Sequence, residues 1–107
     1  MESNQNSVLG TRFKLNVHMP PTDGAHLSNV DWTATVFVKS GYKKLEISKQ
    51  DAIYIDDDNY VIRVDSSLVG AGDYYLTLTA NIPDPDFEDG IRVERKTVPT
   101  GVHIDPI

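Results

Sequence analysis

Two acidic turns contain the residues of this chain that come closest to a chemical motif. Aspartates occupy positions 56–58 without interruption, and they recur as Asp84, Asp86 and Asp89 in a second turn. Calcium takes about six to eight oxygen ligands of this kind. The spacing in the second turn is not that of an EF-hand loop, and Pro85 stiffens it. Aspartate and proline also favour turns for purely conformational reasons. We therefore predict neither a metal site nor a cofactor, and nothing suggests a carboxylate pair fixed across a glycosidase groove.

The histidines and the glycine pair offer equally little chemistry. His18, His26 and His103 do not stand at metal-ligand spacing from one another. A triad could be assembled from Ser28, His26 and Asp23, but no nucleophile elbow surrounds the serine. The segment Gly70-Ala71-Gly72 precedes a strand pattern, whereas a phosphate loop precedes a helix. These observations predict a protein that is not an enzyme.

The net charge and the absence of cysteine exclude several classes of partner and of site. Sixteen acidic residues face ten basic ones, which gives a net charge of −6. Such a surface repels phosphate backbones and anionic lipid, so we expect neither nucleic acid nor membrane as a partner. The chain has no cysteine, which excludes disulfides and thiolate sites. Residues 1–7 are polar and lack the apolar core of a signal peptide.

The secondary structure that the sequence predicts consists of strands. Apolar residues alternate with polar ones over residues 13–19, 30–39, 60–65 and 74–82, which is the period of a half-buried strand. Weaker patterns cover residues 42–48, 52–55, 91–98 and 102–104. Proline and glycine clusters separate these segments, and at most one helical turn fits near residues 48–53. The sequence predicts an all-β, immunoglobulin-like antiparallel sandwich of about seven strands. It is expected to form one domain over residues 11–107, after a disordered leader over residues 1–10.

The period-2 phase also predicts which side chains face inward. Residues that share the apolar phase of four strands should form the core, and we expect it to contain Phe13, Val17, Trp32, Val36, Ile62, Leu76 and Leu78. Three large apolar residues, Phe37, Val61 and Tyr75, instead interrupt faces that otherwise read as polar. Grouped on one surface, such residues mark a binding site. We predict that they form an outward contact stripe.

Five segments together carry a resemblance to a known group of proteins. They are RFKLNV (12–17), LSNVDW (27–32), DNYVIRVD (58–65), GAGDYY (70–75) and IPDPDFEDGIR (82–92). In this order they resemble the immunoglobulin-like N-terminal domains of phage and prophage structural proteins of gut bacteria, which precede collagen-like or tail-fibre segments. They are similar, more distantly, to the N-terminal domain of phage baseplate upper proteins.

The resemblance implies a role in a particle and carries no catalytic residue. We therefore expect a non-catalytic virion or tail module that mediates protein–protein assembly, with other virion or tail proteins or further copies of itself as partners. Its expected location is the virion, assembled in the host cytoplasm. The alternative is a cell-surface domain that binds carbohydrate or a surface partner through the turns around Tyr54 and residues 56–59.

Overall fold

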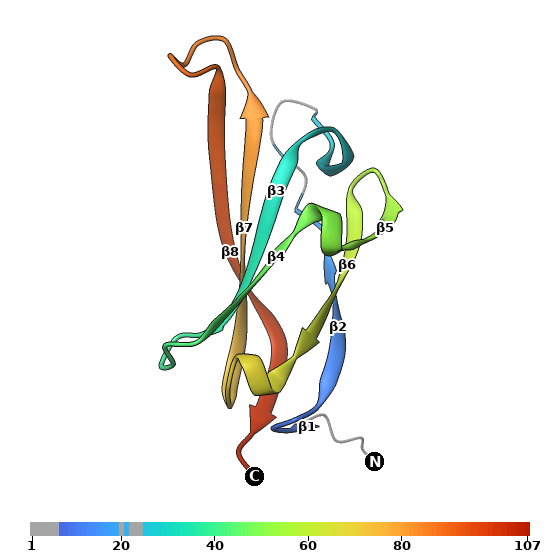
Figure 1. The fold of residues 1–107 in the computed structure, drawn as a ribbon, viewed down its shortest axis with the longest axis vertical. Coiled ribbons are helices and arrows are strands. Elements are labelled where there is room, and N and C mark those ends of the chain that lie inside the picture. The colour runs from blue at the N-terminus through green and yellow to red at the C-terminus, as the bar shows by residue number, and fades with distance from the viewer. Residues whose placement is uncertain (1–6, 20, 22–24) are drawn as a thin grey trace.

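Two packed layers of strands form the fold in the computed structural model, which describes residues 7–19, 21 and 25–107 (Figure 1). Within these residues the strands are β1 (Ser7–Val8), β2 (Arg12–Val17), β3 (Asp31–Val38), β4 (Lys44–Ser48), β5 (Ile53–Asp56), β6 (Asn59–Asp65), β7 (Gly72–Pro83) and β8 (Ile91–Asp105). Three single 3-10 turns, η1 (Leu27–Asn29), η2 (Lys49–Asp51) and η3 (Ser66–Leu68), connect some of them.

The strand order is that of an immunoglobulin domain. One sheet has the order β1-β8-β7-β3-β4, and the other has the order β2-β6-β5. In immunoglobulin lettering, β2 to β8 are strands B, C, C′, D, E, F and G, so a GFCC′ sheet packs on a BED sheet. All neighbouring strands pair antiparallel except β1, which runs parallel to the end of β8. The predicted all-β sandwich is confirmed.

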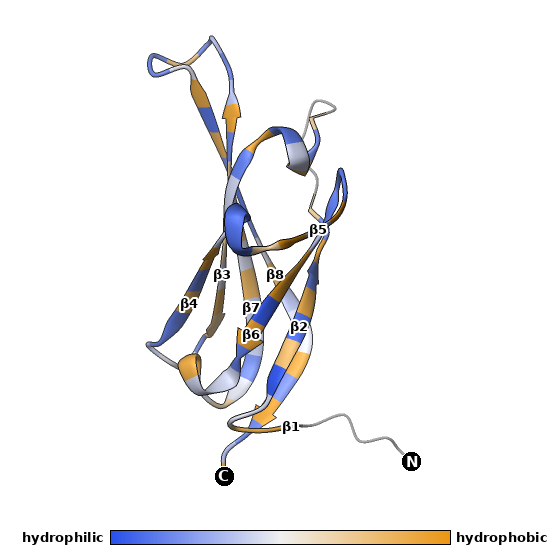
Figure 2. Cartoon of the chain, turned by 45° about the vertical axis from the view of Figure 1, so that its right-hand side comes forward, coloured by the Kyte–Doolittle hydropathy of each residue, from blue (hydrophilic) through white to orange (hydrophobic). Residues whose placement is uncertain are grey.

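The core lies between the sheets and follows the alternation in the sequence. Buried and outward residues alternate along β3, β6 and β7, and Figure 2 shows the same alternation of apolar and polar positions along β2 and β6. Six of the predicted core residues are buried: Val17, Trp32, Val36, Ile62, Leu76 and Leu78. Phe13 is half-buried and packs against them, with its ring centroid 5.7 Å from that of Tyr74.

Tyr74 forms a tyrosine corner at the start of β7. Its hydroxyl donates a hydrogen bond of 2.7 Å to the carbonyl oxygen of Gly70, at the end of the preceding connection. In antibody domains the second cysteine of the inter-sheet disulfide follows this tyrosine by two positions. Leu76 stands there in this chain and is buried. Apolar packing therefore occupies a position that a disulfide bond holds in antibody domains.

Two sequence-based boundaries are wrong. Residues 91–98 and 102–104 belong to one strand, β8, because the segment between them is a bulge opposite Tyr74: the pairing shifts by extra residues on β8, and Gly101 takes a φ of +80°. A side-chain hydrogen bond still joins the two strands at the bulge, because Thr100 Oγ1 donates to the carbonyl oxygen of Tyr74 at 2.9 Å. The predicted leader is also too long, because Ser7 and Val8 pair with β8. Residues 1–6 of that leader lie outside the described part of the chain.

The hairpin formed by β7 and β8 is longer than its neighbours. It projects past the other strands at one end of the molecule, at the top of Figure 1, while the connection between β3 and β4 lies toward the other end. The turn at the end of the hairpin, residues 84–90, is called the hairpin tip below. The hairpin tip and the connection between β3 and β4 therefore lie toward opposite ends of the molecule.

Candidate interaction surface

Two of the three predicted contact residues stack on each other on the outer face of the five-stranded sheet. Phe37 of β3 lies directly opposite Tyr75 of β7 in the strand register. Their ring centroids are 5.9 Å apart with an interplanar angle of 28°, which is a stacked arrangement. The ammonium of Lys39 lies 4.5 Å from the centroid of the Tyr75 ring, within cation–π range. The aromatic pair is thus held in one orientation and covered on one side by a positive charge.

A layer of threonines continues this face beside the aromatic pair. Thr35 faces Thr77, and Thr33 faces Thr79, across β3 and β7. Thr77 and Thr97 share a hydrogen bond of 2.7 Å between their hydroxyl oxygens. Because β-branched side chains are stiff at χ1 and pack well on a pleated surface, this layer forms a firm, polar floor.

Part of this face forms a groove that we call the sheet-face groove, and Tyr75 borders it through its stacking on Phe37. It has a volume of about 480 Å³ and extends from the middle of the sheet to the connection between β3 and β4. Its lining residues are Thr35, Phe37, Val38, Lys39, Gly41, Tyr42, Lys43, Lys44, Glu46, Thr77, Thr79 and Arg95. Four of them are basic and one is acidic, so the groove is locally positive on a chain whose net charge is −6.

The predicted contact stripe of three residues is not formed, because Val61 lies on the other sheet. Val61 is in β6, between Asn16 of β2 and Ile53 of β5. It points outward from the three-stranded sheet, whereas Phe37 and Tyr75 point outward from the five-stranded one. Alternation correctly predicted that each residue faces away from the core. It could not predict that the two outward faces lie on opposite sides of the sandwich.

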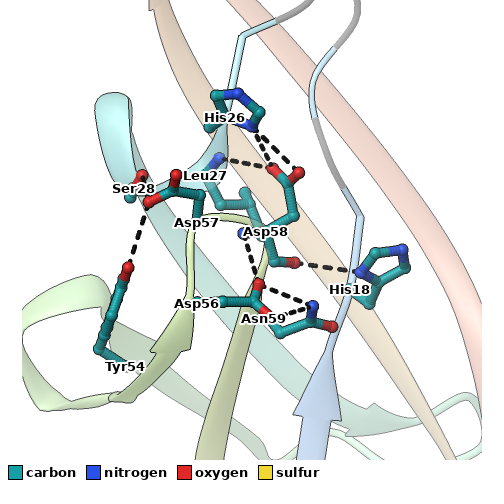
Figure 3. A network of polar contacts seen from close by, with 9 residues as sticks. All are labelled: His18, His26, Leu27, Ser28, Tyr54, Asp56, Asp57, Asp58 and Asn59. Carbon is teal, nitrogen blue, oxygen red and sulfur yellow. Dashed lines mark hydrogen bonds and ion pairs between the residues drawn. The ribbon is translucent and has the colours of Figure 1, made fainter.

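The acidic turn between β5 and β6 holds its carboxylates in a hydrogen-bonded network (Figure 3). Asp57 Oδ1 accepts from the hydroxyl of Tyr54 at 3.1 Å and from that of Ser28 at 3.0 Å. Asp56 Oδ1 accepts from the side-chain amide of Asn59 at 2.8 Å and from the backbone N–H of Asp58 at 3.0 Å. The turn that the carbohydrate-binding alternative would use therefore directs these polar groups toward one another.

The side chains of His26 and His18 also contact this network, both through Asp58. Nδ1 of His26 lies 3.0 Å from Asp58 Oδ2, and Nδ1 of His18 donates to the carbonyl of Asp58 at 3.2 Å (Figure 3). The hydrogen bond and the negative charge of Asp58 raise the pKa of His26 above its ordinary value. The hydroxyl of Ser28 is bonded to Asp57 and His26 to Asp58, so the two do not form a nucleophile–base pair. Asp23, the third member of the triad considered from sequence, lies outside the described residues.

The half-buried His103 of β8 contacts aspartates of both β7 and β8. Nδ1 of His103 lies 2.6 Å from Asp73 Oδ1, and its Nε2 lies 3.0 Å from Asp105 Oδ1. The hydrogen bond that the His103 ring donates to Asp73 is the main cause of a raised pKa for His103, and the charges of both aspartates add to it. This arrangement ties β7 to the end of β8.

The hairpin tip is the second acidic turn, and its backbone is fixed by its own side chains. Asp84 Oδ1 accepts from the backbone N–H of Asp86 at 3.0 Å, and its Oδ2 accepts from Arg92 Nη1 at 2.7 Å. These two hydrogen bonds hold the pKa of Asp84 below its ordinary value. Within the described residues no group of three or more histidines and carboxylates is placed to hold a metal ion.

Sequence reasoning missed the basic lining of the groove. Lys39, Lys43 and Lys44 lie around the connection between β3 and β4, and Arg95 comes from β8, which is more than fifty residues away in sequence. The run of three lysines within 39–44 was a readable signal. Arg95 could be added to it only once β8 was known to pair with β7.

Comparison with known proteins leaves the family of this chain open. The chain matches no family model, and no curated protein sequence matches it. One solved structure, a candidate glycoside hydrolase from Bacteroides vulgatus, is similar over 97% of this chain at 14% sequence identity, with a TM-score of 0.43. This chain spans 17% of the length of that protein. In the described part of the chain, no helix has the length and apolar character needed to cross a membrane.

Proposed function

We propose that this chain is a non-catalytic immunoglobulin-like module that mediates protein–protein assembly through the sheet-face groove. The observation that carries the proposal is the stacked pair of Phe37 and Tyr75 on the outer face of the five-stranded sheet. Outward aromatic rings are costly to leave in water, and aromatic residues are enriched where proteins bind each other. The tyrosine at position 42 adds a third ring to this surface and is 92% exposed.

The chemistry of the groove fits a protein partner. Its lining combines threonine hydroxyl groups, the aromatic rings of Phe37 and Tyr42, and lysine ammonium groups. Aromatic anchors surrounded by polar residues are the usual composition of a binding hot spot. The basic rim on an acidic chain would also steer an acidic partner into place and repel basic ones.

The setting that we propose is a phage or prophage particle, with assembly in the host cytoplasm. It is supported by the resemblance of the five quoted segments to immunoglobulin-like domains of such structural proteins. The carbohydrate-binding alternative, with a cell-surface location, would rely on the turn around Tyr54. Hydrogen bonds within that turn engage the hydroxyl of Tyr54 and the amide of Asn59, so the groove is the better candidate.

A cross-linking experiment tests the proposal, because the chain has no native cysteine. We would place a photo-cross-linker on Thr35→Cys in the groove, and on Lys14→Cys on the outer face of β2 as the matched control. Both labelled proteins would be irradiated in a lysate of phage-producing cells. In a separate experiment they would be incubated with a glycan array. Protein adducts formed from position 35 and not from position 14 would support the proposal. Equal adducts from both positions, or glycan binding that depends on Phe37, would contradict it.

A further inference from the structure

The sheet-face groove has features that restrict what can fill it. Lys39, Lys43, Lys44 and Arg95 make its lining positive, and Glu46 is its one acidic member. Phe37 and the exposed Tyr42 provide apolar surface between these charges. A suitable occupant would be an acidic protein loop that carries an aromatic or aliphatic side chain at its apex.

The hairpin tip of this same chain has that chemistry. Its apex is Phe87, whose side chain is 49% exposed. Asp84, Asp86, Glu88 and Asp89 flank Phe87 in the sequence, and no basic residue lies between positions 84 and 90. Ile91 and Val93, which follow on β8, are exposed as well and extend the apolar surface down the hairpin.

The hairpin tip is also held in one conformation before any binding. The backbone N–H of Gly90 donates to the carbonyl of Phe87 at 2.9 Å, and that of Asp84 donates to the carbonyl of Gly90 at 2.8 Å. Gly90 takes a φ of +77°, which closes the turn. A loop that is already ordered loses little conformational entropy on binding, so its exposed ring can act as an anchor.

A chain cannot fill its own groove with its own tip. The tip projects at one end of the molecule, and the groove runs toward the connection between β3 and β4 near the other end (Figure 1). A contact between the two surfaces must therefore join two copies. Because the two surfaces differ, such a contact is heterologous, and repeating it gives an open chain or a ring.

We propose that the hairpin tip of one copy docks into the sheet-face groove of the next, with Phe87 in the groove beside the aromatic residues and the tip carboxylates against Lys43 and Lys44. The partner is a second copy of this chain. This inference rests on the proposed function, since it names the partner of the same groove. A head-to-tail contact suits a module whose role is to extend a fibre or tail.

Sedimentation velocity over a concentration series, from about 10 μM to about 1 mM, tests the inference on the full chain. We expect the mean mass of the wild type to rise with concentration at low salt. It should fall at about 1 M salt, where charges are screened beyond about 3 Å. Asp86→Asn with Glu88→Gln, and separately Lys43→Gln with Lys44→Gln, should each weaken association about tenfold or more. Phe87→Ser should do the same without a change of charge.

Two further samples make the test specific. Asp51→Asn with Asp73→Asn removes two negative charges away from both surfaces and should associate like the wild type. Mixing the tip variant with the groove variant should give a discrete one-to-one complex, because one partner keeps an intact groove and the other an intact tip. Circular dichroism spectra and melting temperatures of each variant would show that the fold is retained.

The outcomes separate this inference from the proposed function. A wild type that stays monomeric over the whole series would overturn the inference, while a groove-specific cross-link to a different protein would leave the proposed function standing. Association that survives both the tip and the Phe87 variants would also overturn it. If position 35 yields no specific adduct and the chain stays monomeric, both fail.

Discussion

Phe37 and Tyr75 stack on each other across β3 and β7, on the side of the five-stranded sheet that faces away from the core. A cross-strand aromatic pair contributes about 0.2–1 kcal/mol to a sheet. Buried residues of the same strands, such as Val36 and Leu76, contribute to folding through the core instead. We propose that the outward pair serves binding, so the expected effects of substitution differ on the two faces.

Leu76 should be essential for stability. It is buried at the position where an antibody domain has its second disulfide cysteine. Truncation leaves a cavity between the sheets, so we expect Leu76→Ala to lower the free energy of unfolding by about 2–5 kcal/mol in urea denaturation. Thr77→Ala, one residue further along and on the outer face, should cost about 1 kcal/mol or less. Similar costs for the two variants would mean that the register of β7 is incorrect.

The tyrosine corner should contribute a measurable hydrogen bond. Tyr74→Phe removes the hydroxyl that donates to Gly70 and leaves a partly buried carbonyl without that partner. We expect a loss of about 1–2 kcal/mol in the free energy of unfolding. Tyr75→Phe removes the same atom from the next residue on the outward face and should change stability by about 0.5 kcal/mol or less. An equal loss in both variants would show that the bond to Gly70 has no special role.

Gly72 should tolerate no side chain. Its φ is +131°, and a Cβ atom there would lie 2.7 Å from Cγ1 of Val38. Both strain and overlap act against Gly72→Ala, which we expect to destabilise the protein by about 1–3 kcal/mol. The control is Gly41→Ala, whose new Cβ would meet its nearest neighbour at 3.5 Å. Adding Val38→Ala should relieve part of the loss, and full additivity would argue against the overlap.

Stability should decrease as pH rises through the range in which His26 and His103 titrate. Both pKa values are raised by contacts with aspartates that favour the charged ring. When the pKa of a histidine is higher in the folded state than in the unfolded state, protonation stabilises the fold. This stabilisation is complete below the unfolded pKa of 6.5 and is lost as pH rises through the folded pKa. Melting temperatures between about pH 6 and about pH 8.5 should therefore fall. Replacing both histidines by glutamine should flatten the profile, and an unchanged slope would assign it to other groups.

Three carboxylates with lowered pKa values affect stability at low pH. Asp56, Asp65 and Asp84 accept hydrogen bonds that favour their charged forms, from Asn59, Ser67 and the backbone of Asp86 respectively. Their stabilisation is complete above the unfolded value of 3.8 and is lost as pH falls through the lower folded values. The acid loss and the histidine effect therefore lie in separate pH windows.

Alternation of apolar and polar residues predicted the core and the outward faces, because that pattern depends on each strand alone. Trp32 and Leu78 were placed correctly inside, and Phe37 and Tyr75 correctly outside. Whether two outward residues meet depends on strand order, which the pattern does not contain. Phe37 and Tyr75 met because β3 pairs with β7, and Val61 was separated from them because β6 belongs to the other sheet.

Turn signals were less reliable than alternation. Pro99 and Gly101 read as a strand end, yet Pro99 pairs with Tyr75 and Gly101 lies in a bulge within β8, where Thr100 makes hydrogen bonds. The basic groove also escaped sequence reasoning, because its charges come from two strands, β4 and β8, and from the connection between β3 and β4. Local patterns thus predicted the layers, while the surface that we assign to binding required the topology.

The role of the sheet-face groove in binding is tested most directly by the affinity of three alanine variants for the partner that is cross-linked at position 35. Surface plasmon resonance would compare Phe37→Ala and Tyr75→Ala with Val61→Ala, which removes an outward apolar side chain from the opposite sheet. We predict that the first two weaken binding by about thirty-fold, as hot-spot residues do, and that the third leaves the affinity unchanged. Equal loss in all three variants, or loss only with Val61→Ala, would contradict the assignment of the sheet-face groove as the contact surface.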